Sequence, residues 1–230
     1  MRLRNVKNKE EILSNCSFVI DNPTKYKGKW NILFNNNNEI NIEIGTGKCK
    51  FIYEMALKNP NINYIGIEKS ASILAIATKR LERLDNLYLI NYDALKLDEV
   101  FSNEISKIYL NFSDPWPKNR HENRRLTSPN FLKTYDNLFK GEKRIEFKTD
   151  NMKLFEYSIC SLSNYDYIFK CVENSQNIYH IPKVLYHRNV NESQNVENEE
   201  CQSILNHYMR TGIHATVEKT EYSGIYRSRC

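Results

Sequence analysis

A chain of 230 residues, 40% of them hydrophobic and 12% aromatic, is long enough to bury one substantial core, so we expect one domain over residues 1–230. The cationic N-terminus lacks the apolar stretch of a signal peptide, and no run approaches the roughly 20 apolar residues of a membrane span. The six cysteines form no CxxC pairs, so we expect a cytoplasmic protein with reduced thiols, no bound metal and no membrane partner. The net charge of +5 is a mild bias toward polyanions.

Short apolar stretches alternate with segments of helical spacing along most of the chain. The stretches predicted as strands are 40–44, 64–67, 87–90, 108–112, 144–148 and 167–172. The segments predicted as helices are 51–57, 71–84, 95–101, 129–139 and 152–162, with Ser128 and Asp150 as candidate N-caps. Strands that alternate with helices of this length predict an α/β fold with a doubly wound, mostly parallel sheet.

Two segments fall outside this alternation. Residues 1–30 are predicted as a basic N-terminal extension, whose lysines and arginines enlarge a surface for polyanions. Residues 173–200 are polar, rich in Asn, Glu and Gln, and without a clear period. We therefore predict an insertion or a long loop there, before a short helix at 201–209.

The segment IEIGTGK places Glu43, Gly45 and Gly47 at the turn from the first strand to its helix. Glycines at such a turn let a ligand approach the backbone closely, although many tight turns need glycine for φ alone. Glu68 ends the second strand, 23 residues after Gly45, which is the spacing of an acid that binds both hydroxyls of a ribose. The alternative for Glu68 is an acid that interacts with the dipole of the following helix.

Two further acids follow the next two predicted strands, namely Asp93 and Asp114. Asp93 is suited to the adenine edge of a nucleoside that lies across the strand ends, and a turn or cap aspartate is an equal alternative. A dinucleotide carries a pyrophosphate, which Glu43 beside the glycines would repel. S-adenosylmethionine is cationic and free of phosphate, so a pocket of carboxylates favours methyl transfer over hydride transfer.

The segment YLNFSDPWPKNRHENRRL, residues 109–126, begins as a strand and ends in cations. Pro115 and Pro117 fix two φ angles around Trp116, so we expect a stiff loop directly after Asp114. A basic cluster follows this loop, and its members are Lys118, Arg120, His121, Arg124 and Arg125. A basic cluster at the mouth of a pocket is suited to the phosphates of a folded RNA, although most charge runs are ordinary solvated faces.

Together with NYIGIEKS and FKTDN, these motifs resemble the bacterial tRNA (guanine-N7)-methyltransferases, class I enzymes with a Rossmann-like fold that modify guanine-46 in the variable loop of tRNA. The resemblance runs from about residue 26 to residue 151, and it implies that Asp114 is catalytic. The residues that it implies for S-adenosylmethionine are Glu43, Gly45, Gly47, Glu68, Asp93 and Asp114. Those that it implies for the tRNA substrate are Lys118, Asp150, Thr220, Glu221, Tyr222 and Ser223.

The sequence departs from the family pattern at two positions. Cys49 stands where the family has a third glycine, and Ser223 stands where its T-x-Y-E motif ends in an acid. These departures leave open an RNA-binding module of the same fold without turnover, which the intact acids disfavour. A methyltransferase that acts on a protein or a small molecule is a third hypothesis, which the basic loop disfavours. For the assembly we expect a monomer, with a homodimer as the alternative.

Overall fold

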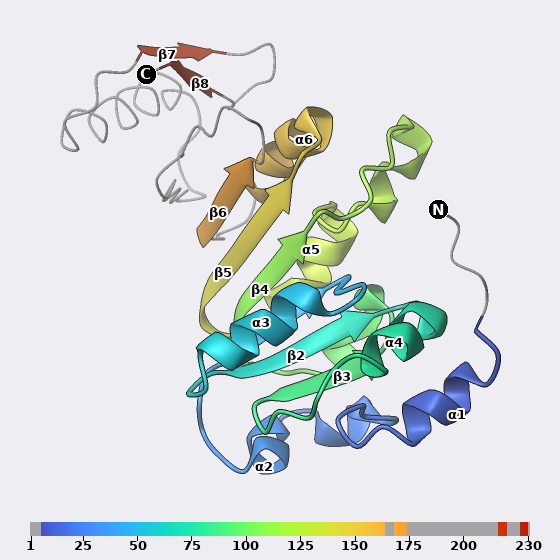
Figure 1. The fold of residues 1–230 in the computed structure, drawn as a ribbon. Coiled ribbons are helices and arrows are strands. Elements are labelled where there is room, and N and C mark those ends of the chain that lie inside the picture. Colours follow the sequence, from blue (N-terminus) through green and yellow to red (C-terminus); the bar gives the residue numbers. More distant parts are fainter. Residues whose placement is uncertain (1–5, 164–167, 174–215, 220–225, 230) are drawn as a thin grey trace.

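The computed structural model describes residues 6–163, 168–173, 216–219 and 226–229, and six parallel strands form its main sheet in the order β3-β2-β1-β4-β5-β6 (Figure 1). These strands are β1 (Ile40–Ile44), β2 (Asn63–Glu68), β3 (Leu87–Asn91), β4 (Ile105–Asn111), β5 (Phe139–Thr149) and β6 (Ile168–Glu173). A separate antiparallel pair consists of β7 (Thr216–Lys219) and β8 (Tyr226–Arg229). The prediction of a doubly wound parallel sheet is confirmed. The predicted insertion beyond residue 173 and the predicted helix at 201–209 lie outside the described residues.

Helices cover both faces of the sheet, with α3 and α4 on one face and α5 on the other (Figure 1). The helices are α1 (Lys9–Ser14), α2 (Trp30–Phe34), α3 (Lys50–Lys58), α4 (Ala71–Thr78), α5 (Pro129–Asp136) and α6 (Met152–Ser163). Three 3₁₀ segments join them, namely η1 (Pro23–Tyr26), η2 (Ala94–Glu99) and η3 (Asn119–Arg124). A central strand covered on both faces has no solvated side, which is why every residue of β1 is buried. None of these described helices is long and apolar enough to cross a membrane.

Three predicted helices are shorter or tighter than expected. The helix predicted at 71–84 ends at Thr78, and the helix predicted at 129–139 ends at Asp136, because Phe139 already belongs to β5. The segment predicted at 95–101 forms the 3₁₀ turns of η2, and Lys96 within it has non-helical backbone angles, φ −119° and ψ 20°. Apolar spacing alone does not distinguish these tighter turns from an α-helix.

The predicted N-cap position is confirmed for α5 and is wrong for α6. Ser128 occupies the N-cap position of α5, but its hydroxyl donates a hydrogen bond to the carbonyl oxygen of Asn123 (3.2 Å) instead of accepting one from the helix. At α6 the cap is Asn151, whose side-chain oxygen accepts from the backbone N–H of Leu154 (2.9 Å). Asp150 is therefore left exposed at the end of β5. Short polar side chains have several backbone partners within reach, and the sequence does not show which one they take.

The described part of the predicted N-terminal extension belongs to the core of the fold. Leu13, Phe18 and Val19 are buried in the cluster that α3 and α4 form with the sheet. The backbone N–H of Leu89 in β3 donates to the carbonyl oxygen of Phe18 (2.8 Å), and that of Ile20 donates to the carbonyl oxygen of Leu89 (2.9 Å). This segment therefore runs alongside β3 and shields that edge of the sheet.

Trp30 fixes α2 against the opposite face. Its side chain is 0% exposed, its indole N–H donates to the carbonyl oxygen of Val100 (3.0 Å), and its ring lies 5.3 Å from that of Phe101. The carboxylate of Glu104 accepts from the backbone N–H groups of Gly28 (2.8 Å) and Trp30 (3.1 Å). The start of α2 is thus held by a buried aromatic ring and by the carboxylate of the residue that precedes β4.

We expect Trp30→Ala to lower the free energy of unfolding by about 3–5 kcal/mol, because it leaves a cavity and an unpaired carbonyl oxygen. Ile32→Ala on the same helix is the matched control, since Ile32 is 68% exposed and its loss should change stability by about 0.5 kcal/mol or less. Urea unfolding followed by circular dichroism measures both values. Equal losses in the two variants would contradict the packing described for α2.

Candidate functional site

A pocket of about 600 Å³ lies at the carboxyl ends of β1, β2 and β3, within the size range of small-molecule sites. In an open α/β sheet, ligands bind outside this edge. Its apolar lining consists of Ile44, Ile67, Ala94, Leu95, Leu126 and Phe131. Its polar and aromatic lining consists of Glu68, Lys69, Tyr92, Asp93, Trp116, Asn123 and Arg124, with Gly45 at the turn.

The turn after β1 has the backbone geometry that its glycines predict. Gly45 and Gly47 have φ angles of 75° and 56°, in the left-handed region that only glycine enters without a steric cost. Cys49 has a φ of 60°, so the position where the family pattern has glycine keeps a glycine-like backbone. Burial raises the pKa of the Cys49 thiol to about 12, so this side chain is a neutral packing group.

Glu68 connects this turn to the start of α4. One of its carboxylate oxygens accepts from the backbone N–H of Gly47 (3.0 Å), and the other accepts from that of Ser70 (2.8 Å). A ribose hydroxyl that donates to Glu68 would share or displace these donors. The alternative role at the helix start has geometric support as well, because Ser70 is the N-cap residue of α4. The structure places Glu68 in the pocket, and both roles use the same carboxylate.

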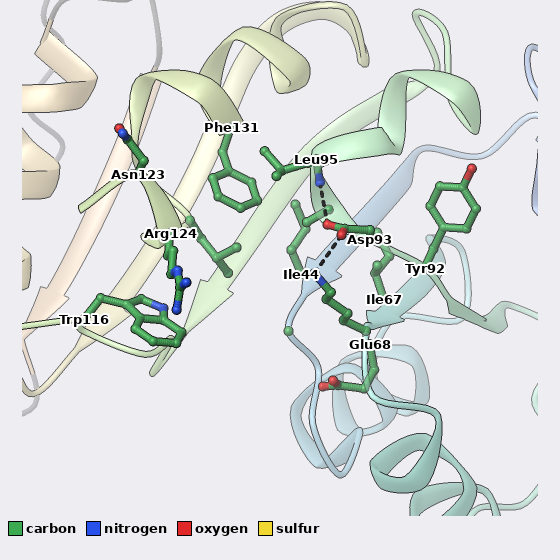
Figure 2. Close-up of a pocket in the computed structure, with 14 residues that line it drawn as sticks. Ile44, Ile67, Glu68, Tyr92, Asp93, Leu95, Trp116, Asn123, Arg124 and Phe131 are labelled. Atoms are coloured by element: carbon green, nitrogen blue, oxygen red, sulfur yellow. Dashed lines mark hydrogen bonds and ion pairs between the residues drawn. The ribbon is translucent and has the colours of Figure 1, made fainter. Parts of the chain in front are cut away.

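Asp93 lies on the same side of the pocket, at the start of η2. Its carboxylate accepts from the backbone N–H of Leu95 (3.1 Å), an interaction marked in Figure 2. The carboxylate also pairs with the ammonium of Lys69 (2.7 Å). Burial by itself would raise the pKa of Asp93, but the hydrogen bonds from Lys69 and Leu95 outweigh that effect and lower it. Asp93 is therefore ionised at neutral pH, and it supplies a fixed acceptor beside the apolar floor.

Glu43 lies behind the glycine turn and does not line the pocket. Its buried carboxylate accepts from the hydroxyl of Thr46 (2.6 Å) and from the side-chain amide of Asn111 (2.8 Å). Burial raises the pKa of Glu43 by more than these hydrogen bonds lower it. In this arrangement Glu43 joins the glycine turn to the end of β4, and it is not among the residues that line the pocket, where its motif suggests it.

The loop after β4 forms the opposite wall. Figure 2 shows Trp116 and Arg124 together on that side, and the guanidinium carbon of Arg124 lies 5.0 Å from the centre of the Trp116 ring. Asp114 is exposed, two residues before Trp116. Phe112 and Trp116 have φ angles of 48° and 42°, which cost bulky residues on the order of 1–3 kcal/mol each and are typical of functional loops. The prolines predict the stiffness of this loop, but they do not predict these angles.

The basic cluster divides into an exposed face and an inner part. His121 is half-buried, with its ring 5.7 Å from that of Trp116 in an edge-on contact. Arg125 is buried and donates to the carbonyl oxygens of Pro115 and Trp116, so its guanidinium faces the loop. The exposed cations are Lys118, Arg120 and Arg124.

The other residues predicted to contact the substrate lie elsewhere. Asp150 is exposed at the same edge of the sheet, directly after β5. Thr220, Glu221, Tyr222 and Ser223 lie outside the described residues.

Several lining residues were not predicted as site residues, although Lys69 and Leu126 lie within the motifs NYIGIEKS and YLNFSDPWPKNRHENRRL. Lys69 and Tyr92 directly follow β2 and β3, so their position after a strand is the signal that could have found them. Leu126 and Phe131 come from the connection to α5 and from α5 itself. Their place in the pocket depends on how that connection folds back over the sheet, which spacing along the chain does not reveal.

The acceptors and apolar side chains around the pocket match the chemistry of S-adenosylmethionine. A carboxylate at the end of β2 is suited to a ribose diol, and an acceptor and apolar side chains at the end of β3 are suited to adenine. A glycine turn leaves space for the backbone to approach the remainder of the ligand. With the doubly wound sheet, this defines an S-adenosylmethionine-dependent methyltransferase of the Rossmann-like class.

Comparison with known proteins gives the family within this class. A family model described as "Putative methyltransferase" matches residues 37–205. The tRNA (guanine-N(7)-)-methyltransferase of Geobacillus sp. (strain WCH70) is 53% identical over 75% of this chain and 80% of its own. The protein of the same name from Bacillus subtilis (strain 168) is 49% identical over 72% of this chain and 79% of its own. The chain therefore belongs to the tRNA (guanine-N7)-methyltransferase family.

Glu68→Gln should weaken binding of S-adenosylmethionine by about 1.5–3 kcal/mol, because a charged acceptor for the ribose hydroxyls is lost. Isothermal titration calorimetry measures the affinity directly. Glu82→Gln is the matched control, since Glu82 is exposed beyond the end of α4 and does not line the pocket. An unchanged affinity in Glu68→Gln would refute the assignment of this acid to the ribose and leave its role at the start of α4.

Proposed function

We propose that this chain transfers a methyl group from S-adenosylmethionine to N7 of guanine-46 in the variable loop of tRNA. The observation that carries the proposal is that the loop with the basic cluster also forms one wall of the candidate cofactor pocket. Trp116 and Arg124, which belong to the basic loop, line the pocket whose other side holds Glu68 and Asp93. A cationic segment suited to RNA and a pocket suited to the cofactor thus meet at one edge of the sheet. We place the enzyme in the cytoplasm, as a monomer.

Binding of the cofactor uses side chains that are already oriented. Glu68 accepts from the ribose hydroxyls, and Asp93 is suited to the exocyclic amine of adenine between the apolar side chains of Ile67 and Leu95. When bound, S-adenosylmethionine supplies a methyl group that its sulfonium makes electrophilic. The turn at Gly45 carries no side chain that would block the approach of the methionine portion.

Asp114 has an orienting and electrostatic role in this proposal. Guanine N7 carries an in-plane lone pair and no proton at neutral pH, so the reaction needs no general base. The Asp114 carboxylate accepts from N1–H and from the exocyclic amine of guanine, which directs N7 toward the pocket. It also stabilises the positive charge that develops on the purine as the new bond forms.

The tRNA contacts follow from the exposed cations. Lys118, Arg120 and Arg124 project from the segment that follows Asp114, and their charges are suited to phosphates on either side of the target nucleotide. The guanine must leave its stack for its Watson–Crick edge to reach Asp114. Trp116 lies beside this position and is suited to contact the extruded base.

The alternative of an RNA-binding module without turnover loses one of its supports. It was motivated partly by Cys49, and the backbone at Cys49 keeps the left-handed conformation that a glycine would adopt. The buried thiol does not line the pocket. We therefore favour an active enzyme over a binding module.

One assay tests the proposed function. The protein is incubated with S-adenosylmethionine labelled in its methyl group and with bulk tRNA that lacks the modification, and the labelled nucleoside is identified by mass spectrometry. We expect 7-methylguanosine, located in the variable loop by digestion into oligonucleotides. Label in another nucleoside would overturn the substrate assignment, and transfer to protein or small molecules alone would favour the third hypothesis.

We expect Asp114→Asn to fold and to bind S-adenosylmethionine normally but to lower kcat by roughly 10²–10³-fold, as for a lost electrostatic contact in a transition state. The amide keeps the size of the side chain and loses its charge and half of its acceptors. Single-turnover methylation of tRNA measures the effect. Asp85→Asn, at an exposed position before β3, is the matched control. A near-normal rate in Asp114→Asn would reduce this residue to a structural part of its loop.

Arg120→Ala should weaken tRNA binding and flatten its salt dependence, because each lost phosphate contact lowers the slope of log K against log salt by about 0.7–0.9. Binding of S-adenosylmethionine should not change, since Arg120 does not line the pocket. Affinities measured at several salt concentrations give the slope. Arg83→Ala is the control, because Arg83 lies before the start of β3, at the opposite edge of the sheet. An unchanged slope in Arg120→Ala would show that this arginine meets no phosphate.

A further inference from the structure

Arg125 differs from the other cations of its segment, because it is buried (8% exposed). Its Nε donates to the carbonyl oxygen of Pro115 (3.1 Å), and a terminal nitrogen donates to that of Trp116 (3.2 Å). On the other side, its guanidinium carbon lies 4.2 Å from the centre of the Tyr157 ring in α6. Two loop carbonyls and one aromatic face therefore surround a charge that the sequence assigns to RNA.

The loop that Arg125 holds depends on such external contacts. Phe112 and Trp116 both have positive φ, a conformation that bulky residues keep only where their surroundings determine it. Pro115 and Pro117 have no N–H to donate, so the carbonyl groups between them are the principal points of attachment. The planar guanidinium of Arg125 donates to two successive carbonyls, which fixes the orientation of both peptide groups.

A second contact joins the same stretch of chain to α6. The hydroxyls of Thr127 and Ser158 form a buried hydrogen bond of 2.7 Å, and the Ser158 hydroxyl also donates to the carbonyl oxygen of Leu154 (2.7 Å). Tyr157 precedes Ser158 on the same helix. Helix α6 is thus the support against which Arg125 and its neighbours hold the loop.

We infer that Arg125 is a positioning residue for methyl transfer, which sets the orientation of the loop that carries Asp114 and Trp116. Asp114 precedes the first carbonyl that Arg125 holds, and Trp116 carries the second, so a change at Arg125 moves both side chains. Arg125 itself does not line the pocket. The inference rests on the proposed function for its catalytic consequence, and on geometry alone for the held loop.

The test compares Arg125→Lys with Arg83→Lys, an exposed control before β3. Lysine keeps the charge but replaces the planar fork with a single ammonium group, so it cannot hold both carbonyls in the same way. We expect the single-turnover rate at saturating S-adenosylmethionine and tRNA to fall about 10²-fold, as for a misplaced catalytic group. Affinity for S-adenosylmethionine, measured by calorimetry, should stay within about twofold, because Glu68 and Asp93 lie on the opposite wall of the pocket and are held by partners other than Arg125.

A second readout reports the loop without any reaction. The chain has two tryptophans, and Trp30 is 0% exposed, so collisional quenching of fluorescence by acrylamide reports Trp116. We expect more efficient quenching in Arg125→Lys than in wild type or in Arg83→Lys. Tyr157→Leu, which removes the aromatic face, should shift quenching and rate in the same direction by a smaller amount.

Three results would overturn the inference. The first is a normal saturated rate with unchanged quenching in Arg125→Lys. The second is a loss of tRNA affinity and of its salt slope at a normal saturated rate, which would make Arg125 a phosphate contact. The third is a loss of S-adenosylmethionine affinity together with a lower Tm, which would make Arg125 a support of the whole fold. If the wild-type protein does not methylate tRNA, the proposed function fails, and quenching alone decides whether Arg125 holds the loop.

Discussion

The parallel arrangement of the strands is the constraint on which the site depends. Because all six strands of the main sheet run in one direction, the residues that follow them meet at one edge. Gly45, Glu68 and Asp93, which are far apart in the sequence, therefore line one pocket, and the exposed Asp114 follows β4 at the same edge of the sheet. Each lies within a few residues of the end of its strand, where the backbone leaves the sheet and its side chains become free to contact a ligand.

The residues on the two sides of the pocket are held in place by different kinds of hydrogen-bond partner. On the side of β2 and β3, Glu68 and Asp93 accept from backbone N–H groups and from Lys69, so a ligand that donates to these carboxylates would exchange existing hydrogen bonds for new ones. On the side of β4, the loop has few donors of its own and is held by Arg125 from outside. The first side is suited to selecting a ligand, and the second is suited to holding a strained backbone in one conformation.

The sequence predicts the positions of the strands and of the acids, because both follow from local patterns. Alternating apolar and helical segments give all six strands of the main sheet, although β5 begins five residues before the predicted start at residue 144. The glycine turn has the positive φ angles that its residues indicate. The sequence does not predict the direction in which a charged side chain points. Glu43 does not line the pocket and Arg125 faces the loop, because each is buried against partners from elements distant in the sequence, Asn111 at the end of β4 and Tyr157 in α6.

The structure of the protein in complex with S-adenosylhomocysteine tests the central claim most directly. We expect the ribose hydroxyls on the Glu68 carboxylate, the adenine between Ile67 and Leu95 with its amine toward Asp93, and the homocysteine sulfur facing the loop of Asp114 and Trp116. A nucleoside bound outside this pocket would contradict the account. So would a complex in which Glu68 keeps both of its contacts, with Gly47 and Ser70, and touches no ribose hydroxyl.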